Sequence, residues 1–169
     1  HDLASAIASR VASDDQTVVV LDDDPTGTQT VYDLPVLTEW SGSTIEQEFG
    51  RGTAAFYVMT NSRSLDPDGA AEVNRIIARR LLKAARAHGR RLSIISRSDS
   101  TLRGHYPLEI DVLAETLGGA DGQIIVPFFA EGGRLTIHDV HYVAEGDQLV
   151  PAAQTPFARD AAFGFSQSN

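Results

Sequence analysis

Residues 17–27 read TVVVLDDDPTG, and this stretch decides the fold. It opens with an uninterrupted run of β-branched and aliphatic side chains, which is typical of a strand buried on both faces of a parallel sheet. The run stops at three consecutive aspartates, and Thr26 and Gly27 then allow a tight turn that brings backbone amides close to a ligand. We therefore expect a central strand that carries carboxylates to one edge of a sheet.

Similar apolar runs recur along the chain and alternate with stretches of helical periodicity. We expect further strands near 53–59, 92–96 and 123–127, and a shorter one near 35–38. This alternation predicts an α/β fold, in which helices flank a mostly parallel sheet.

Two helices of the predicted fold have clear boundaries. The longer covers about 68–88, with an N-cap at Asp66 or Asp68 and an end at Gly89. A second covers about 107–117 and begins at a proline, whose missing amide hydrogen costs nothing in the first turn. The apolar stripe of the longer helix consists of Val73, Ile76, Ile77, Leu81 and Ala84.

The length of 169 residues and the hydrophobic content of 42% suit one globular domain. Residues 1–16 carry no motif and are expected to form an N-terminal surface segment, followed by an α/β domain over 17–169. Residues 140–150, VHYVAEGDQLV, predict a β-hairpin excursion near the C-terminal end. The tail 155–169 shows no closing strand or helix, so we expect a truncated domain and a protein that continues.

Composition excludes several classes of partner. The formal net charge of −9 would repel nucleic acid and anionic membranes, since both need a basic surface to neutralise their phosphates. No run approaches the roughly 20 apolar residues that span a bilayer. The absence of cysteine excludes disulfides and thiolate metal sites. We expect a cytoplasmic protein whose partner is a small molecule.

A polar cluster follows each predicted strand at once. The clusters are DDDPTGTQ at 22–29, TNSRS at 60–64, SRSDSTLRG at 96–104 and FFAEGGR at 128–134. Because ligands of open α/β sheets bind at the carboxyl ends of the strands, we expect one site built from four loops.

The residue types in these loops indicate a site for a hydroxylated anion. Arginine forks bind carboxylate or phosphate at two points, while aspartates accept hydrogen bonds from hydroxyls or take their protons. Three adjacent carboxylates also repel one another, so at least one should be paired, bound to a cation or raised in pKa. The simpler alternative is that the arginines are surface charges and the aspartates cap helices. The arginines are Arg63, Arg97, Arg103 and Arg134, and the aspartates are Asp22, Asp23 and Asp24.

A second enzyme class starts from the same loop. Residues 22–26 fit the D-x-D-x-T signature of haloacid-dehalogenase-like phosphatases, in which Asp22 would be the nucleophile and Asp24 the acid/base. That chemistry also needs a lysine and a later acidic pair for Mg²⁺. The only lysine, Lys83, lies in the long predicted helix, and no paired aspartates follow a later strand.

Other motifs are missing or favour a structural interpretation. The sequence has no phosphate-binding G-x-x-x-x-G-K-[ST] loop, no G-x-G-x-x-G after the first strand and no G-x-S-x-G elbow. His138 and His141 would point to opposite faces of a strand, so we interpret them as structural and predict no metal site. His105 either touches substrate or is solvated.

At these residues the chain resembles the N-terminal domain of the four-carbon acid sugar kinase family, formerly a domain of unknown function. The resemblance covers nearly everything after residue 16, and its motifs follow the family's order. Arg97 is a departure, because many relatives have lysine there, and the two cations differ in donor geometry. The matching stretches are DDPTG at 23–27, TNSR at 60–63, SDSTLRG at 98–104, PFFAEGGRLT at 127–136 and TPFARDAAFGF at 155–165.

The resemblance implies an enzyme of two domains that uses ATP and Mg²⁺ to phosphorylate threonate, erythronate or a 3-oxo-tetronate. The N-terminal domain would hold the sugar acid, and a C-terminal domain would carry most of the ATP site. Asp23 and Asp24 would then lie beside the reacting hydroxyl. The residues expected to bind substrate are Ser98, Asp99, Arg103, Gly104, Arg63, Arg97 and Arg134.

We therefore expect the substrate-binding part of a sugar-acid kinase, inactive without its ATP-binding domain. Phosphoryl transfer would depend on positioning and charge neutralisation, with an aspartate accepting the hydroxyl proton. A non-catalytic sugar-acid-binding module is the remaining alternative, because it needs the same arginines and no ATP domain.

Overall fold

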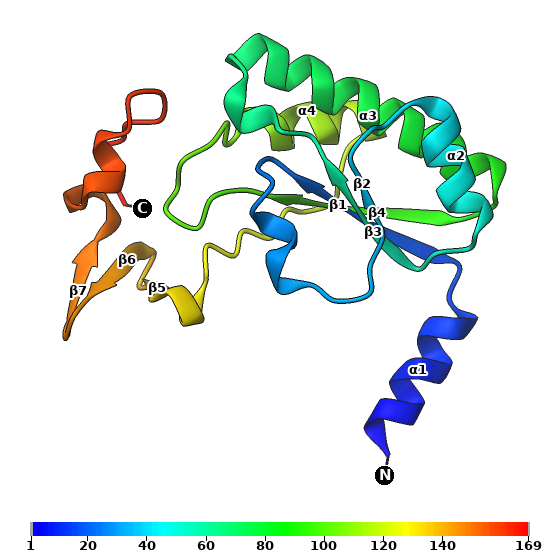
Figure 1. The fold of residues 1–169 in the computed structure, drawn as a ribbon, viewed down its shortest axis with the longest axis horizontal. Helices are drawn as coiled ribbons and strands as arrows, with labels where there is room; N and C mark the ends of the chain where they lie inside the picture. Colours follow the sequence, from blue (N-terminus) through cyan, green and yellow to red (C-terminus); the bar gives the residue numbers. More distant parts are fainter. Residues whose placement is uncertain (1, 169) are drawn as a thin grey trace. The chain divides into compact units, whose positions relative to one another are not determined.

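The computed structural model describes residues 2–168 (Figure 1). The chain forms two compact units. The first comprises the chain up to Arg97 together with Pro107–Gly119, and the second comprises Ser98–Tyr106 and the chain from Ala120 onward.

The first unit is built on a four-stranded parallel sheet. Its strands are β1 (Gln16–Asp22), β2 (Val36–Leu37), β3 (Ala55–Met59) and β4 (Arg91–Arg97), in the order β2-β3-β1-β4. The central β1 pairs with β3 on one side and with β4 on the other, both in parallel. Its buried apolar run explains this central place, because only an inner strand is covered on all sides. The predicted parallel α/β sheet is thus confirmed.

Helices cover the sheet. The longest is α3 (Pro67–Ala87), whose N-cap Asp66 accepts a hydrogen bond of 2.8 Å from the backbone N–H of Gly69. It ends before Gly89, which has a positive φ of 62°. The helix α4 (Leu108–Leu117) packs against α3. Both helices were predicted.

Sequence reasoning missed the helix α2 (Gly42–Gly50). Ser41 caps it by accepting a hydrogen bond of 3.2 Å from the backbone N–H of Thr44. Its inward residues, Ile45 and Phe49, stand one turn apart and are buried. The helix is short, so its periodicity is weak, but the serine cap and this apolar pair were readable signals.

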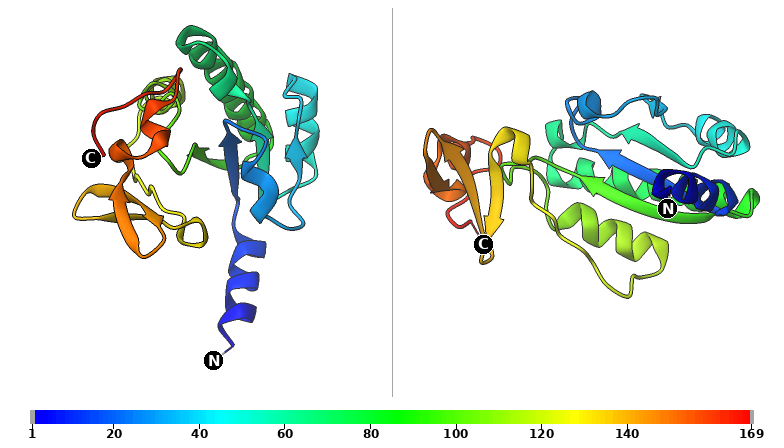
Figure 2. Two further views of the ribbon diagram at one scale, coloured as in Figure 1. Left: turned by 60° about the vertical axis from the view of Figure 1, so that its left-hand side comes forward. Right: turned by 90° about the horizontal axis from the view of Figure 1, so that it is seen from below.

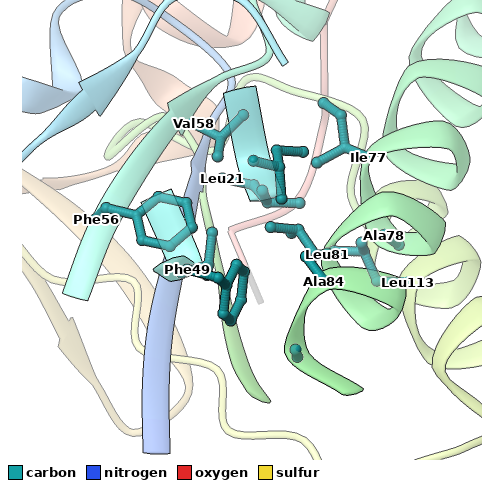
Figure 3. Packing of buried hydrophobic residues seen from close by; sticks show 12 residues of the cluster. Leu21, Phe49, Phe56, Val58, Ile77, Ala78, Leu81, Ala84 and Leu113 are labelled. Carbon is teal, nitrogen blue, oxygen red and sulfur yellow. The ribbon is translucent and has the colours of Figure 1, made fainter. Parts of the chain in front are cut away.

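The core of the first unit lies between the sheet and the helices (Figure 3). Phe49 of α2 and Phe56 of β3 meet edge to face with their ring centroids 5.7 Å apart. Such a pair contributes about 0.5–1.5 kcal/mol beyond the area that it buries. The buried cluster consists of Val19, Leu21, Ile45, Phe49, Phe56, Val58, Ile77, Ala78, Leu81, Ala84, Ala85 and Leu113.

The N-terminal segment contains the helix α1 (Leu3–Ser13), drawn in blue in Figure 1. Its apolar residues Leu3, Ile7 and Val11 are all exposed. These three apolar side chains of α1 therefore lie at the surface.

The second unit contains a separate antiparallel sheet, drawn in yellow to orange in Figure 2. Its strands are β5 (Arg134–Ile137), β6 (Val140–Glu145) and β7 (Gln148–Pro151), in the order β5-β6-β7. Gly146 turns the β6–β7 hairpin with a φ of 62°. The predicted hairpin excursion is confirmed and has a third strand. Short 3₁₀ turns complete the two units, at Gly27–Thr30, Ser62–Ser64, Ala130–Gly132, Ala152–Gln154 and Pro156–Arg159.

The strand predicted near 123–127 is wrong, because these residues form no regular element. Ile124 is 92% exposed and Val126 is 70% exposed. Gly118 and Gly119 end α4 with positive φ angles of 94° and 99°. A strand exists only where a neighbour completes its hydrogen-bond ladder, and an apolar run of this length does not show whether it has one.

Candidate functional site

Three of the four predicted loops lie at the carboxyl ends of parallel strands. The register of the sheet sets Asp22 opposite Met59 of β3 and Arg97 of β4. The backbone carbonyl of Asp22 accepts a hydrogen bond of 2.9 Å from the N–H of Thr60, and the N–H of Asp23 donates to the carbonyl of Arg97 at 3.3 Å. The sheet therefore fixes where the loops after β1 and β3 begin.

Asp23 and Arg63 form a two-point ion pair within the first unit. The Nε of Arg63 donates to Oδ2 of Asp23 at 3.0 Å, and its Nη2 donates to Oδ1 at 2.7 Å. Asp23 is only 3% exposed and the Arg63 side chain 17%. This geometry is the strong form of the arginine–carboxylate pair. In the structure Arg63 holds a carboxylate of the protein itself.

Asp24 is the more accessible carboxylate, with 27% of its side chain exposed. Its Oδ1 accepts hydrogen bonds from the hydroxyl and from the backbone N–H of Thr26, and the Nη1 of Arg63 lies 3.5 Å from its Oδ2. The Thr26 hydroxyl, then its N–H and the charges of Arg63 and Arg97, lower the pKa of Asp24. Asp24 is thus an ionised, partly exposed acceptor at neutral pH.

Asp22 has the opposite environment. Its side chain is fully buried, and its Oδ1 accepts a hydrogen bond of 3.1 Å from the Nη1 of Arg97. Its Oδ2 is also buried and meets no donor among residues 2–168. Burial raises the pKa of Asp22 above the usual range, although Arg97 opposes the shift. The prediction that at least one of the three carboxylates is paired or raised in pKa is confirmed here.

Gly27 packs directly over Asp22. A Cβ added at this glycine would overlap the Asp22 carboxylate, and no side chain of a larger residue fits there. The glycine of the DDDPTG stretch is therefore required by close approach to a buried acid.

The SDSTLRG residues form a hydrogen-bonded cluster in the second unit. The Oδ2 of Asp99 accepts a hydrogen bond of 2.8 Å from the Nε of Arg103, and also bonds to the hydroxyl of Thr101. The hydroxyl of Ser98 donates to the carbonyl of Arg103 at 3.4 Å. Gly104 follows with a φ of 148°. Asp99 thus organises the turn that presents Arg103.

Arg103 and Arg134 share an aromatic neighbour that sequence reasoning missed. The guanidinium carbon of Arg103 lies 5.2 Å from the ring centroid of Phe157, and that of Arg134 lies 5.7 Å from the same centroid. Arg134 also lies 6.0 Å from the ring of Phe129. The Nη1 of Arg103 approaches the carboxylate of Asp160 at 3.5 Å. Phe157 and Asp160 both belong to the stretch TPFARD at 155–160, which resembles the family but was given no predicted role in the site.

The histidines have structural contacts. His105 is buried and meets the ring of Phe163 edge to face at 4.9 Å, so the solvated alternative is wrong. His141 is buried, and its Nε2 lies 2.8 Å from the carbonyl of Ser100. His138 has a positive φ of 51° in the turn between β5 and β6.

A buried polar network lies beneath the loop after β3. The Oε1 of Glu109 accepts hydrogen bonds from the hydroxyl of Ser62 at 2.5 Å and from the amide of Asn74 at 2.9 Å. The Ser62 hydroxyl in turn lies 2.9 Å from that of Thr60, which donates to the carbonyl of Asp22 at 3.0 Å. No sequence signal pointed to this network, because its members are far apart in the chain.

Within residues 2–168, no group of three or more acidic or histidine side chains is arranged to hold a metal ion. In the same part of the chain, no helix is both long and apolar enough to cross a membrane. The meeting of all four predicted loops in one site stays a prediction.

Comparison with known proteins shows the same relationship in three ways. The family model of the sugar-binding N-terminal domain matches residues 18–169. A D-erythronate kinase of Heliobacterium modesticaldum is 31% identical over 151 residues, which cover 85% of this chain and 32% of the relative.

A solved structure gives the third comparison. It is a domain of unknown function from Bordetella bronchiseptica, crystallised with bound citrate as a domain-swapped dimer. It matches with a TM-score of 0.67 and 29% identity, over 90% of this chain and 39% of the solved chain. The chain therefore spans between 32% and 39% of the length of these relatives.

Proposed function

The chain belongs to the family of sugar-binding N-terminal domains, and from that membership we propose that it is the substrate-binding part of an ATP-dependent kinase for a four-carbon sugar acid. The observation that carries the proposal is the environment of Asp24, an ionised and partly exposed carboxylate whose charge is offset by Arg63. The name of the relative, D-erythronate kinase, supports this substrate class. The citrate in the solved relative is likewise a hydroxylated acid.

In this function Asp24 accepts the proton of the hydroxyl that attacks the phosphoryl group. A general base must be ionised and within reach of substrate, and Asp24 meets the first condition through the bonds from Thr26. Its exposed fraction of 27% supports the second, because it leaves the carboxylate open to a ligand. Asp23 is held by Arg63 and therefore acts by fixing the loop that carries Asp24.

Each unit offers residues of the predicted loops that we propose as binding groups for the sugar acid. Arg97 has 35% of its side chain exposed and offers donors to an anion beside Asp22. In the second unit, Arg103 and Arg134 are further proposed cations for the sugar acid, and Ser98, Asp99 and Gly104 shape the turn that presents Arg103. Arg63 takes part through Asp23 and Asp24.

ATP and Mg²⁺ are assigned to parts of the protein outside these residues. The sequence has none of the phosphate-binding loop motifs sought, and the described residues include no group of three or more acidic or histidine side chains arranged to hold a metal ion. We also propose a surface segment over 1–16, a sugar-acid-binding domain over 17–169, and the cytoplasm as the compartment.

The phosphatase alternative is less well supported. It requires Asp22 to attack a phosphate ester, but this side chain is fully buried, paired with Arg97 and raised in pKa. A carboxyl group that is enclosed and paired with an arginine is a poor nucleophile. The non-catalytic binding module makes the same contacts to ligand and differs only in lacking phosphoryl transfer.

The experiment uses the complete protein that contains these residues. It is incubated with ATP, Mg²⁺ and either erythronate or threonate, and the products are identified by mass spectrometry. A sugar-acid phosphate formed together with ADP is the expected result. Binding of the acid without any product would support the binding module instead, and phosphate attached to Asp22 after incubation with a phosphate ester would support the phosphatase.

A further inference from the structure

Asp22 of the first unit has a buried carboxyl group, and one of its oxygens accepts no hydrogen bond within residues 2–168. Its side chain has no exposed surface, and Oδ1 accepts a hydrogen bond from Arg97. The buried Oδ2 meets no donor within residues 2–168, and Gly27 closes the space above it. A carboxylate is stable in such a place only if its charge is balanced, because water cannot reach it.

Among the described charged groups around Asp22, Arg97 supplies the positive charge that offsets the carboxylate. Arg97 comes from the neighbouring β4. Asp23 and Asp24 follow in the chain and add negative charge, and burial together with Asp23 raises the pKa of Asp22. Two hydrogen bonds of Arg63 go to Asp23, and its Nη1 lies 3.5 Å from the carboxylate of Asp24. Arg97 is therefore the charged group that favours the ionised form of Asp22.

An anionic ligand that binds Arg97 weakens the compensation of the negative charge on Asp22. Its carboxylate competes for the guanidinium, and its charge acts on Asp22 even if the bond between Arg97 and Asp22 survives. Both effects favour the neutral form of a buried acid. We propose that Asp22 is a further residue of the sugar-acid site and takes up a proton at Oδ2 when the carboxylate of the ligand binds Arg97.

This inference rests on the proposed function, which places the sugar acid at Arg97. The proton comes from solvent, so one negative charge enters the site with one positive charge. The net charge of the buried region stays constant, and the strand end can receive an anion beside three aspartates. This explains the exceptional burial of Asp22 next to the more exposed Asp24.

Proton uptake fixes the sign of the pH dependence. Because the bound state holds more protons at Asp22 than the free state, the affinity for the acid rises as the pH falls. The change reaches at most about tenfold per pH unit, between the pKa of Asp22 in the free protein and its higher pKa in the complex. Above that range the dependence disappears.

The test is calorimetric titration of the complete protein with erythronate, in buffers of different ionisation enthalpy and at several pH values. The wild type is expected to take up as much as one proton per bound acid. Asp22→Asn keeps the size of the side chain but cannot titrate, so its uptake should vanish and its affinity should lose the pH dependence. Asp111→Asn, at an exposed position of α4, is the matched control and should behave like the wild type.

A direct measurement covers the case in which Asp22→Asn does not fold. Carbon-13 NMR of the aspartate carboxyls in the wild type should show one pKa that rises when erythronate is added. Binding without proton uptake, or uptake that persists in Asp22→Asn, overturns the role of Asp22 and leaves the proposed function standing. Failure of erythronate, threonate and citrate to bind at all overturns both.

Discussion

Arg63 grips Asp23 at two points, and its own backbone N–H donates to the carbonyl of Asp23 at 3.2 Å. The loop after β3 is thereby fastened to the first residue after β1. Asp24 is the next residue in the chain, so its position depends on this ion pair and on the backbone hydrogen bond beside it.

Weakening the ion pair between Arg63 and Asp23 should lower the free energy of unfolding. Arg63→Lys keeps the charge but offers a single ammonium in place of the fork, and we expect a loss of about 1–3 kcal/mol in the free energy of unfolding. Denaturant unfolding measures it. A double-mutant cycle with Asp23→Asn should show coupling of at least about 0.5 kcal/mol between the two positions. Purely additive losses would mean that the pair does not hold the loop.

Asp24→Asn should lower turnover of the complete enzyme by about 10² to 10⁴, the usual contribution of a general base. The amide still accepts hydrogen bonds from Thr26, so the fold and the affinity for the sugar acid should change little. Steady-state rates and circular dichroism measure the two effects. Wild-type turnover in Asp24→Asn, together with a loss in Asp23→Asn, would move the catalytic role to Asp23.

Arg103→Lys should weaken binding of the sugar acid by about 1.5–3 kcal/mol, because the two-point geometry toward a carboxylate is lost. The contacts with Phe157 and Asp160 hold the guanidinium but not a flexible ammonium. Titration with a sugar acid and with its uncharged alcohol analogue separates charge recognition from general damage. Arg159→Lys, at an exposed position, is the control. Equal discrimination by mutant and wild type would exclude the role.

Glu109→Ala should destabilise the protein by about 2–4 kcal/mol. It leaves the donors of Ser62 and Asn74 without their shared acceptor and opens a cavity beneath the loop after β3. Glu109→Gln keeps an oxygen for both donors and should lose less. Denaturant unfolding of the two variants tests this order. If both lost the same amount, the hydrogen bonds to Oε1 would not be the cause.

The layout of the first unit was predictable because its signals are local. The apolar run of 17–21 indicated a buried strand, and the stripe and caps of α3 indicated a helix and its ends. The carboxyl-edge placement of the loops followed from parallel pairing. The weak local signal at α2 was passed over, and the apolar run at 123–127 was assigned to a strand without a partner to complete it.

The different roles of the three aspartates could not be predicted, since they stand side by side in the sequence. Folding turns Asp22 inward beside Arg97, ties Asp23 to Arg63 and leaves Asp24 accessible with Thr26. The environment of each carboxylate depends on which groups, distant in the sequence, lie next to it after folding.

The sequence alone determined the strands β1, β3 and β4, the helices α3 and α4 and the chemical character of the sheet edge, because strand and helix patterns and residue types are properties of neighbouring positions. The tertiary structure decided which acid is fully buried, which is paired at two points with Arg63 and which is partly exposed. The free energy of a charge depends on burial and on partners brought together from far along the chain, and no local pattern contains that information.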